Sequence, residues 1–66
     1  MIRITKVSDG YRAHAEPPSV SQAWDSEHAM TARELMSELV SRGAHPRDVA
    51  DAFSFVEPNW QEVLDS

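Results

Sequence analysis

Acidic side chains recur at one-turn spacing in the second half of the chain, and their pattern is consistent with a binding surface. Glu34 and Glu38 are four residues apart, and Asp48 and Asp51 are three apart. Side chains at these spacings share one face of an α-helix, with Cβ atoms about 5–6 Å apart. Such rows of carboxylates can substitute for the phosphates of a nucleic-acid strand, which rises about 3.4 Å per residue.

The net charge of the chain points to the same kind of partner. Eleven Asp and Glu against six Lys and Arg give a net charge of −5, and no basic residue follows Arg47. Glu57 and Glu62 extend the acidic charge towards the C-terminus. Because a field of this sign repels phosphate groups, we expect a protein partner with a basic surface and no direct binding of nucleic acid.

Phe55 is the candidate apolar anchor of this surface, because it projects beside Asp48 and Asp51 rather than in the buried stripe of its helix. An aromatic residue with a charged rim is typical of a protein interface. The alternative is that Phe55 packs against Trp60 or the hairpin. The acidic residues also have an alternative role in solubility, with Glu38 pairing with Arg42. The candidate partner-binding residues are Glu34, Glu38, Asp48, Asp51, Phe55, Glu57 and Glu62.

Catalytic and metal-binding patterns are weak in this sequence. His14, His28 and His45 form no i,i+4 pair, and the chain has no Cys. Its two glycines lie in neither a nucleophile elbow nor a phosphate loop. We therefore expect no enzymatic activity, no metal and no cofactor. Residues 32–56 could suggest a DNA-binding helix-turn-helix, but Asp48 and Asp51 would meet the DNA backbone with the wrong sign.

The residues before position 31 predict a β-hairpin and a connector. Asp9-Gly10 is typical of a two-residue type I′ turn, which would place Ile4 opposite Ala15 and Lys6 opposite Ala13. The alternation predicts an inward face formed by Ile2, Ile4, Tyr11, Ala13 and Ala15. Two prolines end the hairpin at residue 16, and residues 23–29 predict a short third strand with Trp24 turned inward.

The remaining residues predict short helices. Thr31 and Glu34 have the spacing of a capping box, and Gly43 suits the end of a helix over residues 32–42. Pro46 opens a second helix and Pro58 a third. The buried positions of these helices are predicted as Ala32, Leu35, Met36, Leu39, Val40, Val49, Ala52, Phe53, Val56, Trp60, Val63 and Leu64.

The predicted architecture is a single α+β domain over residues 1–66, in which a hairpin (1–16) and a connector (17–30) precede a helical part (31–66). The chain shows no export signal and no apolar run near 18 residues, and it lacks Cys. We therefore expect a cytoplasmic protein without membrane contact, as a monomer or a weak homodimer.

The D-G-Y-R hairpin, the lone Trp24, and the segments M-T-A-R-E-L-M-S-E-L and H-P-R-D-V-A-D-A-F resemble very short proteins from bacterial mobile elements. The pattern is most similar to the small anti-CRISPR inhibitors of the type I-C Cascade complex. This resemblance implies a phage-derived protein that occupies a basic channel of Cascade in the host cytosol and blocks target-DNA binding. It assigns no residue a role. The alternative function is a small interaction module, either a homodimer or an antitoxin-like partner, that binds through an apolar patch.

Overall fold

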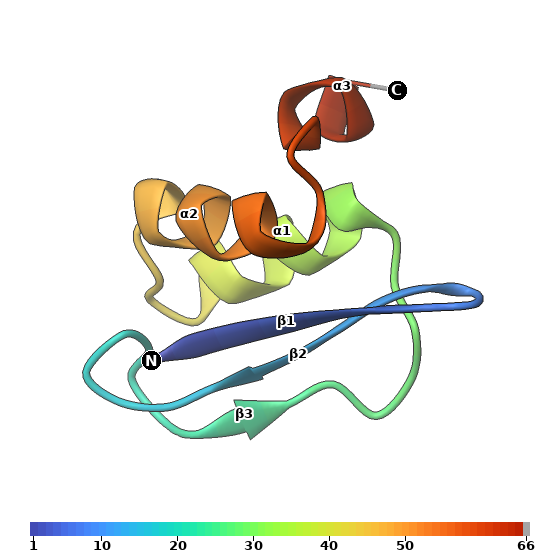
Figure 1. Cartoon of the computed structure of the whole chain (residues 1–66). Helices are drawn as coiled ribbons and strands as arrows, with labels where there is room; N and C mark the ends of the chain where they lie inside the picture. The colour runs from blue at the N-terminus through green and yellow to red at the C-terminus, as the bar shows by residue number, and fades with distance from the viewer. Residues whose placement is uncertain (66) are drawn as a thin grey trace.

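Three β-strands are followed by three helices in the computed structural model, which describes the backbone of residues 1–65 and the side chains of residues 1–62. The elements are β1 (Ile2–Val7), β2 (Gly10–Ala15), β3 (Trp24–Asp25), α1 (Ala32–Ser41), α2 (Pro46–Val56) and α3 (Trp60–Asp65). The strands form an antiparallel sheet in the order β1-β2-β3. Figure 1 shows α1 and α2 over one face of this sheet and α3 beyond them. The predicted α+β fold and its third strand are confirmed.

The predicted register of the hairpin is wrong by two residues. Ile4 pairs with Ala13 rather than with Ala15, and Lys6 pairs with Tyr11 rather than with Ala13. Because side chains alternate across a strand with a period of two, a shift of two residues leaves each side chain on its predicted face. The inward face of the hairpin is therefore as predicted, although its pairing is not.

The turn explains the shift. Its two central residues are Ser8 and Asp9, and neither has a positive φ, whereas a type I′ turn needs a positive φ at both positions. Gly10 begins β2 with a φ of +144°, and a Cβ there would lie 2.5 Å from the carbonyl oxygen of Met30. Tyr11 and Met30 exchange two backbone hydrogen bonds of 2.8 and 2.9 Å, which bring the two segments together. Both the turn and the close approach of the Met30 segment therefore require a glycine at position 10.

The helix boundaries follow from local capping. The Thr31 hydroxyl accepts a hydrogen bond from the Glu34 N–H at 3.1 Å, and the Glu34 carboxylate accepts one from the Thr31 N–H at 3.2 Å. This is the predicted capping box. Gly43 follows α1 with a φ of +106°, as expected for a residue that ends a helix. Pro46 begins α2 as predicted, after His45 as its N-cap.

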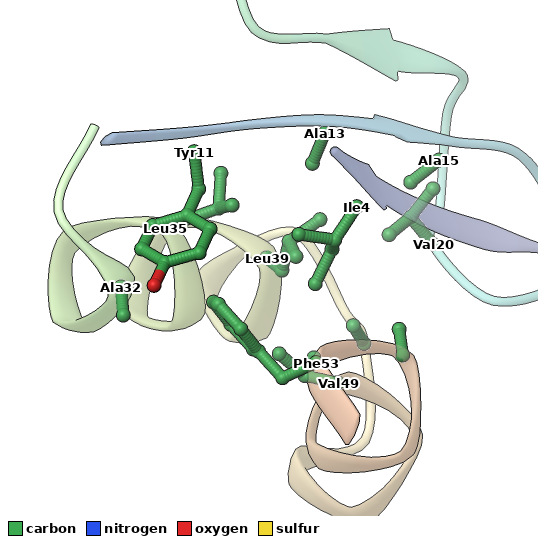
Figure 2. Close-up of a cluster of buried hydrophobic side chains, with 12 residues drawn as sticks. Ile4, Tyr11, Ala13, Ala15, Val20, Ala32, Leu35, Leu39, Val49 and Phe53 are labelled. Atoms are coloured by element: carbon green, nitrogen blue, oxygen red, sulfur yellow. The ribbon is translucent and has the colours of Figure 1, made fainter. Parts of the chain in front are cut away.

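The core lies between the sheet and the first two helices, and Figure 2 shows its side chains converging from both layers. Phe53 is fully buried and meets the Tyr11 ring edge-to-face, with the ring centroids 5.5 Å apart. The buried hydrophobic residues are Ile4, Tyr11, Ala13, Ala15, Val20, Ala32, Leu35, Leu39, Ala44, Val49, Ala52 and Phe53. Five of these twelve are alanines, so few large side chains fill the core.

The margins of the core differ in detail from the prediction. Trp24 and Trp60 are half-buried and pack against the edge of the core rather than inside it. Val40 is exposed, although its spacing placed it in the buried stripe. The inward positions predicted for Val63 and Leu64 lie outside the described side chains. Among the described residues, no helix has the length and apolarity needed to cross a membrane.

Candidate partner-binding surface

Two of the predicted acidic residues are occupied by contacts within α1 and its ends. The side chain and backbone of Thr31 donate hydrogen bonds to Glu34 and hold the pKa of its carboxyl below the usual range. Glu38 forms a salt bridge with Arg42, with 2.8 Å between Oε1 and Nε, and the guanidinium of Arg42 lies 4.7 Å from the centroid of a Trp24 ring. The i,i+4 alternative is therefore confirmed for Glu38, and both carboxylates of the α1 row are held by contacts within the chain, although Glu34 stays exposed.

Glu57 connects the end of α2 to the hairpin. Its side chain is only 16% exposed, and it accepts hydrogen bonds from Lys6 Nζ and, at 2.9 Å, from the Tyr11 hydroxyl. The bond from Lys6, followed by the bond from Tyr11, lowers the pKa of the Glu57 carboxyl. The same contact raises the pKa of Lys6, whereas burial is the main cause that raises the pKa of Tyr11. This contact also accounts for Lys6, a charged residue on the inward face of the hairpin.

The remaining predicted carboxylates are free to meet a partner. Asp48, Asp51 and Glu62 are exposed, and no described cation forms a salt bridge with them. Asp48 and Asp51 lie one turn apart on α2 and line the same surface hollow. The structure therefore reduces the predicted acidic strip to a pair of carboxylates on α2, with Glu62 separate on α3.

Phe55 projects from α2 beside this pair. Its side chain is 89% exposed, so the alternative that it packs against Trp60 or the hairpin is wrong. Two adjoining hollows meet at its ring. One contains Asp48 and Asp51, and the other extends along β1. We define the Phe55 surface as the residues shared by or flanking these hollows on α2 and at the start of the chain: Met1, Ile2, Asp48, Asp51, Ala52 and Phe55.

Sequence reasoning missed the part of this surface that β1 supplies. Met1 is 52% exposed and Ile2 is half-buried, and both line the hollow next to Phe55. The hairpin prediction treated Ile2 as a core residue. A signal was available in the strand order, because a third strand that pairs with β2 leaves β1 at the edge of the sheet, where its first residues meet solvent.

The face of the sheet opposite the helices carries both charges. Arg3, Arg12 and His14 line a hollow there with Asp25. The Arg12 guanidinium donates a hydrogen bond to the Ser26 carbonyl oxygen at 3.0 Å. His14 nitrogens lie 3.7 Å from a Glu16 oxygen and 3.9 Å from an Asp25 oxygen. Two arginines and two carboxylates thus meet on the outer face of the sheet, and Arg3 at its edge also lines the hollow beside Phe55.

These hollows suit contact with a macromolecule better than enclosure of a small molecule. The two hollows at Phe55 have volumes of about 310 and 220 Å³ and lie on the surface between α2 and the start of the chain. Within the described part of the chain, no three His, Asp or Glu side chains are close enough to hold a metal ion. The arrangement offers an exposed aromatic ring, a short apolar floor and two carboxylates, which are the components of a protein-binding surface.

Comparisons of the chain with protein-family models, with curated proteins and with solved structures give no match.

Proposed function

We propose that this protein is a non-enzymatic binding module that binds a protein partner through the Phe55 surface. The main support for this proposal is the position of Phe55. Its side chain is almost fully exposed, whereas the opposite face of the same helix is buried in the core. Enclosing such a side chain in a partner's pocket contributes about 2–3 kcal/mol. Rigid aromatic anchors of this kind supply much of the energy of protein interfaces.

The two carboxylates beside Phe55 define the charge of the partner. Asp48 and Asp51 share the hollow with the Phe55 ring, so a pocket that accepts the ring also brings its rim close to both carboxylates. Lys or Arg side chains on that rim satisfy them, and a net charge of −5 on the whole chain draws a basic surface in from a distance. The partner therefore presents an apolar pocket with basic groups at its margin.

A capture experiment with matched variants tests the proposal. Tagged protein is used to recover partners from a bacterial lysate, and each is identified by mass spectrometry. We expect Phe55→Ala to lose the specific partner and the double variant Asp48→Lys/Asp51→Lys to lose most of it. The control, Asp9→Lys/Glu27→Lys, changes the net charge by the same amount at exposed loop positions away from α2 and should retain the partner. Equal recovery by Phe55→Ala and the unmodified protein contradicts the proposal.

A second candidate is the nucleic-acid mimic that blocks target-DNA binding by type I-C Cascade. The observation in its favour is that Asp48, Asp51 and Glu62 are exposed without a salt bridge to a described cation, in a segment of sequence with no basic residue. Against it, Glu34, Glu38 and Glu57 are occupied internally.

A gel-shift competition tests the mimic. If the mimic is correct, adding the purified protein lowers duplex-DNA binding by purified Cascade, and the effect weakens with salt. Unchanged DNA binding at a large excess of the protein contradicts this second candidate but leaves the first proposal standing.

A further inference from the structure

The first strand of the sheet has a free edge. The strand order is β1-β2-β3, so β1 pairs with β2 on one side only. The other edge belongs to β3, which has two residues, whereas β1 has six. Long open edges present unpaired backbone donors and acceptors, and they are common sites for pairing with another chain.

The ladder fixes which backbone groups of β1 point outward. Met1 and Glu16 exchange hydrogen bonds of 2.9 and 3.0 Å, so Met1 faces β2. Hydrogen-bonded and non-hydrogen-bonded pairs alternate in an antiparallel ladder. The N–H and C=O groups of Ile2, Ile4 and Lys6 therefore point away from β2.

Contacts on the far side of β2 agree with this assignment. Tyr11, which faces Lys6, bonds to Met30 instead, and Ala13, which faces Ile4, bonds to Ser26. Among the described residues, no hydrogen bond reaches the outward backbone groups of Ile2, Ile4 or Lys6. Three successive donor and acceptor positions along this edge are thus unpaired, with Ile2 half-buried, Ile4 only 5% exposed and Lys6 exposed.

The free edge and the Phe55 surface adjoin. Ile2, Ala52 and Phe55 line both hollows, and Ile4 lines the one that runs along β1. A strand added beside β1 would point alternate side chains towards α2, where they would meet the Phe55 ring and the carboxylates of Asp48 and Asp51. Its other side chains would lie on the outer face of the sheet, next to Arg3.

We propose that the partner adds an extended segment to β1 as a fourth strand of the sheet. This inference rests on the proposed function, because it describes how the same surface binds. The segment alternates between two faces. The face towards α2 contains apolar side chains flanked by Lys or Arg, and the face next to Arg3 contains polar or acidic side chains.

A second copy of the chain is a poorer occupant of this edge. Two copies bring together two chains that each have a net charge of −5. A symmetric antiparallel pairing of β1 about Ile4 places Lys6 of each copy opposite Ile2 of the other, so a charged side chain meets an apolar one at both ends. Charged residues on edge strands commonly act against self-pairing in this way.

The test uses two acetylated and amidated peptides of identical composition and zero net charge. The sequence Lys-Glu-Val-Thr-Val-Glu-Lys places Lys and Val on one face and Glu and Thr on the other, and it is the same in both chain directions. The control, Glu-Lys-Val-Thr-Val-Lys-Glu, exchanges the charges of the two faces. Binding to the full chain is followed by NMR titration, with amide hydrogen exchange at Ile4 as the readout of strand addition.

We expect the first peptide to bind at least about tenfold more tightly than the control and to slow amide exchange at Ile4 by about tenfold or more at saturation. Lys6→Pro removes one outward donor, and Lys6→Ala is its matched control because both lose the contact with Glu57. We expect Lys6→Pro to bind about fivefold to tenfold more weakly than Lys6→Ala. The exchange measurement uses the unmodified protein, so it does not depend on how well the proline variant folds.

Each other outcome overturns a defined claim. Absence of binding at millimolar peptide, equal binding of both peptides, or unchanged exchange at Ile4 overturns strand addition. If a captured partner depends on Phe55 while Lys6→Pro and Lys6→Ala bind it equally, strand addition is wrong and the proposed function stands. If the partner is indifferent to Phe55→Ala, the proposed function fails as well. Dimers of the protein at the same concentrations, with slowed amide exchange at Ile4 in the absence of peptide, would show that a second copy occupies the edge.

Discussion

The two phenylalanines of α2 should respond in opposite ways to the same substitution. Phe53 is fully buried in a core of twelve residues, five of them alanines. Replacing a buried Phe by Ala costs about 3–5 kcal/mol. A chain of 66 residues has a total stability of only about 3–10 kcal/mol, so Phe53→Ala should lose about a third of it or more. Phe53→Leu, which loses the ring contact with Tyr11 but fills most of the volume, should cost about 1–2 kcal/mol.

Phe55→Ala should leave stability nearly unchanged. An enclosed Phe buries about 150–250 Å², and at 89% exposure only about 20 Å² of Phe55 is covered. That area contributes about 0.5 kcal/mol, and the higher helix propensity of Ala returns a similar amount. The net change in the free energy of unfolding should therefore lie within about 0.5 kcal/mol of zero.

Urea unfolding followed by circular dichroism measures the effects of the Phe53 and Phe55 substitutions in the same assay. The midpoint should fall clearly for Phe53→Leu and stay constant for Phe55→Ala, with the same dependence of free energy on urea in all variants. A loss of more than about 1 kcal/mol in Phe55→Ala would show that its ring supports the fold. The reasoning that assigns Phe55 to partner binding would then be refuted.

Three further substitutions test the local structure by the same unfolding assay. Thr31→Ala removes the N-cap of α1 and should cost about 1 kcal/mol, whereas Thr31→Ser should cost little. Gly10→Ala should cost about 2 kcal/mol or more, because the added Cβ meets the Met30 carbonyl and the φ of +144° is unfavourable for Ala, and a neutral result would contradict the close approach. The pKa of Glu57 is lowered in the fold, so its stabilising contribution is present above its ordinary pKa and is lost as the pH falls through the folded value. Between about pH 5 and pH 3, the stability of Glu57→Gln should therefore fall less steeply than that of the unmodified protein, and identical pH profiles would show that the Lys6 contact does not matter.

Local signals predicted most of the fold because the structure satisfies them locally. The capping box at Thr31, the proline at position 46 and the positive φ at Gly43 depend on a few neighbouring residues, and all three are as predicted. The hairpin register failed because Gly10 meets the backbone of Met30, twenty residues away, and turn statistics contain no information about that contact.

The candidate surface was predictable only in part for the same reason. Residues on one helix, such as Asp48 and Asp51, can be placed together from their spacing. The contribution of Ile2 depends on the strand order, and the loss of Glu57 to an internal contact depends on Lys6, which is 51 residues distant in sequence. Charge counts give the number of carboxylates in the chain. Which carboxylates are exposed without an internal partner depends on the fold.

Under the proposed function, the acidic residues on α2 serve solubility and binding at once, so charge reversal perturbs both. A chain that exposes a phenylalanine beside an open strand edge is at risk of self-association, and carboxylates at that edge repel a second copy. In the proposed function, the same two carboxylates attract a basic partner. Replacing them by Lys removes both effects, so lost binding and new aggregation could be confused. Truncation of Phe55 has no such ambiguity, because it lowers the risk of aggregation while it removes the anchor. A partner that is lost with Phe55 but kept when two loop carboxylates are reversed is therefore bound through the apolar anchor and does not depend on the overall charge of the chain.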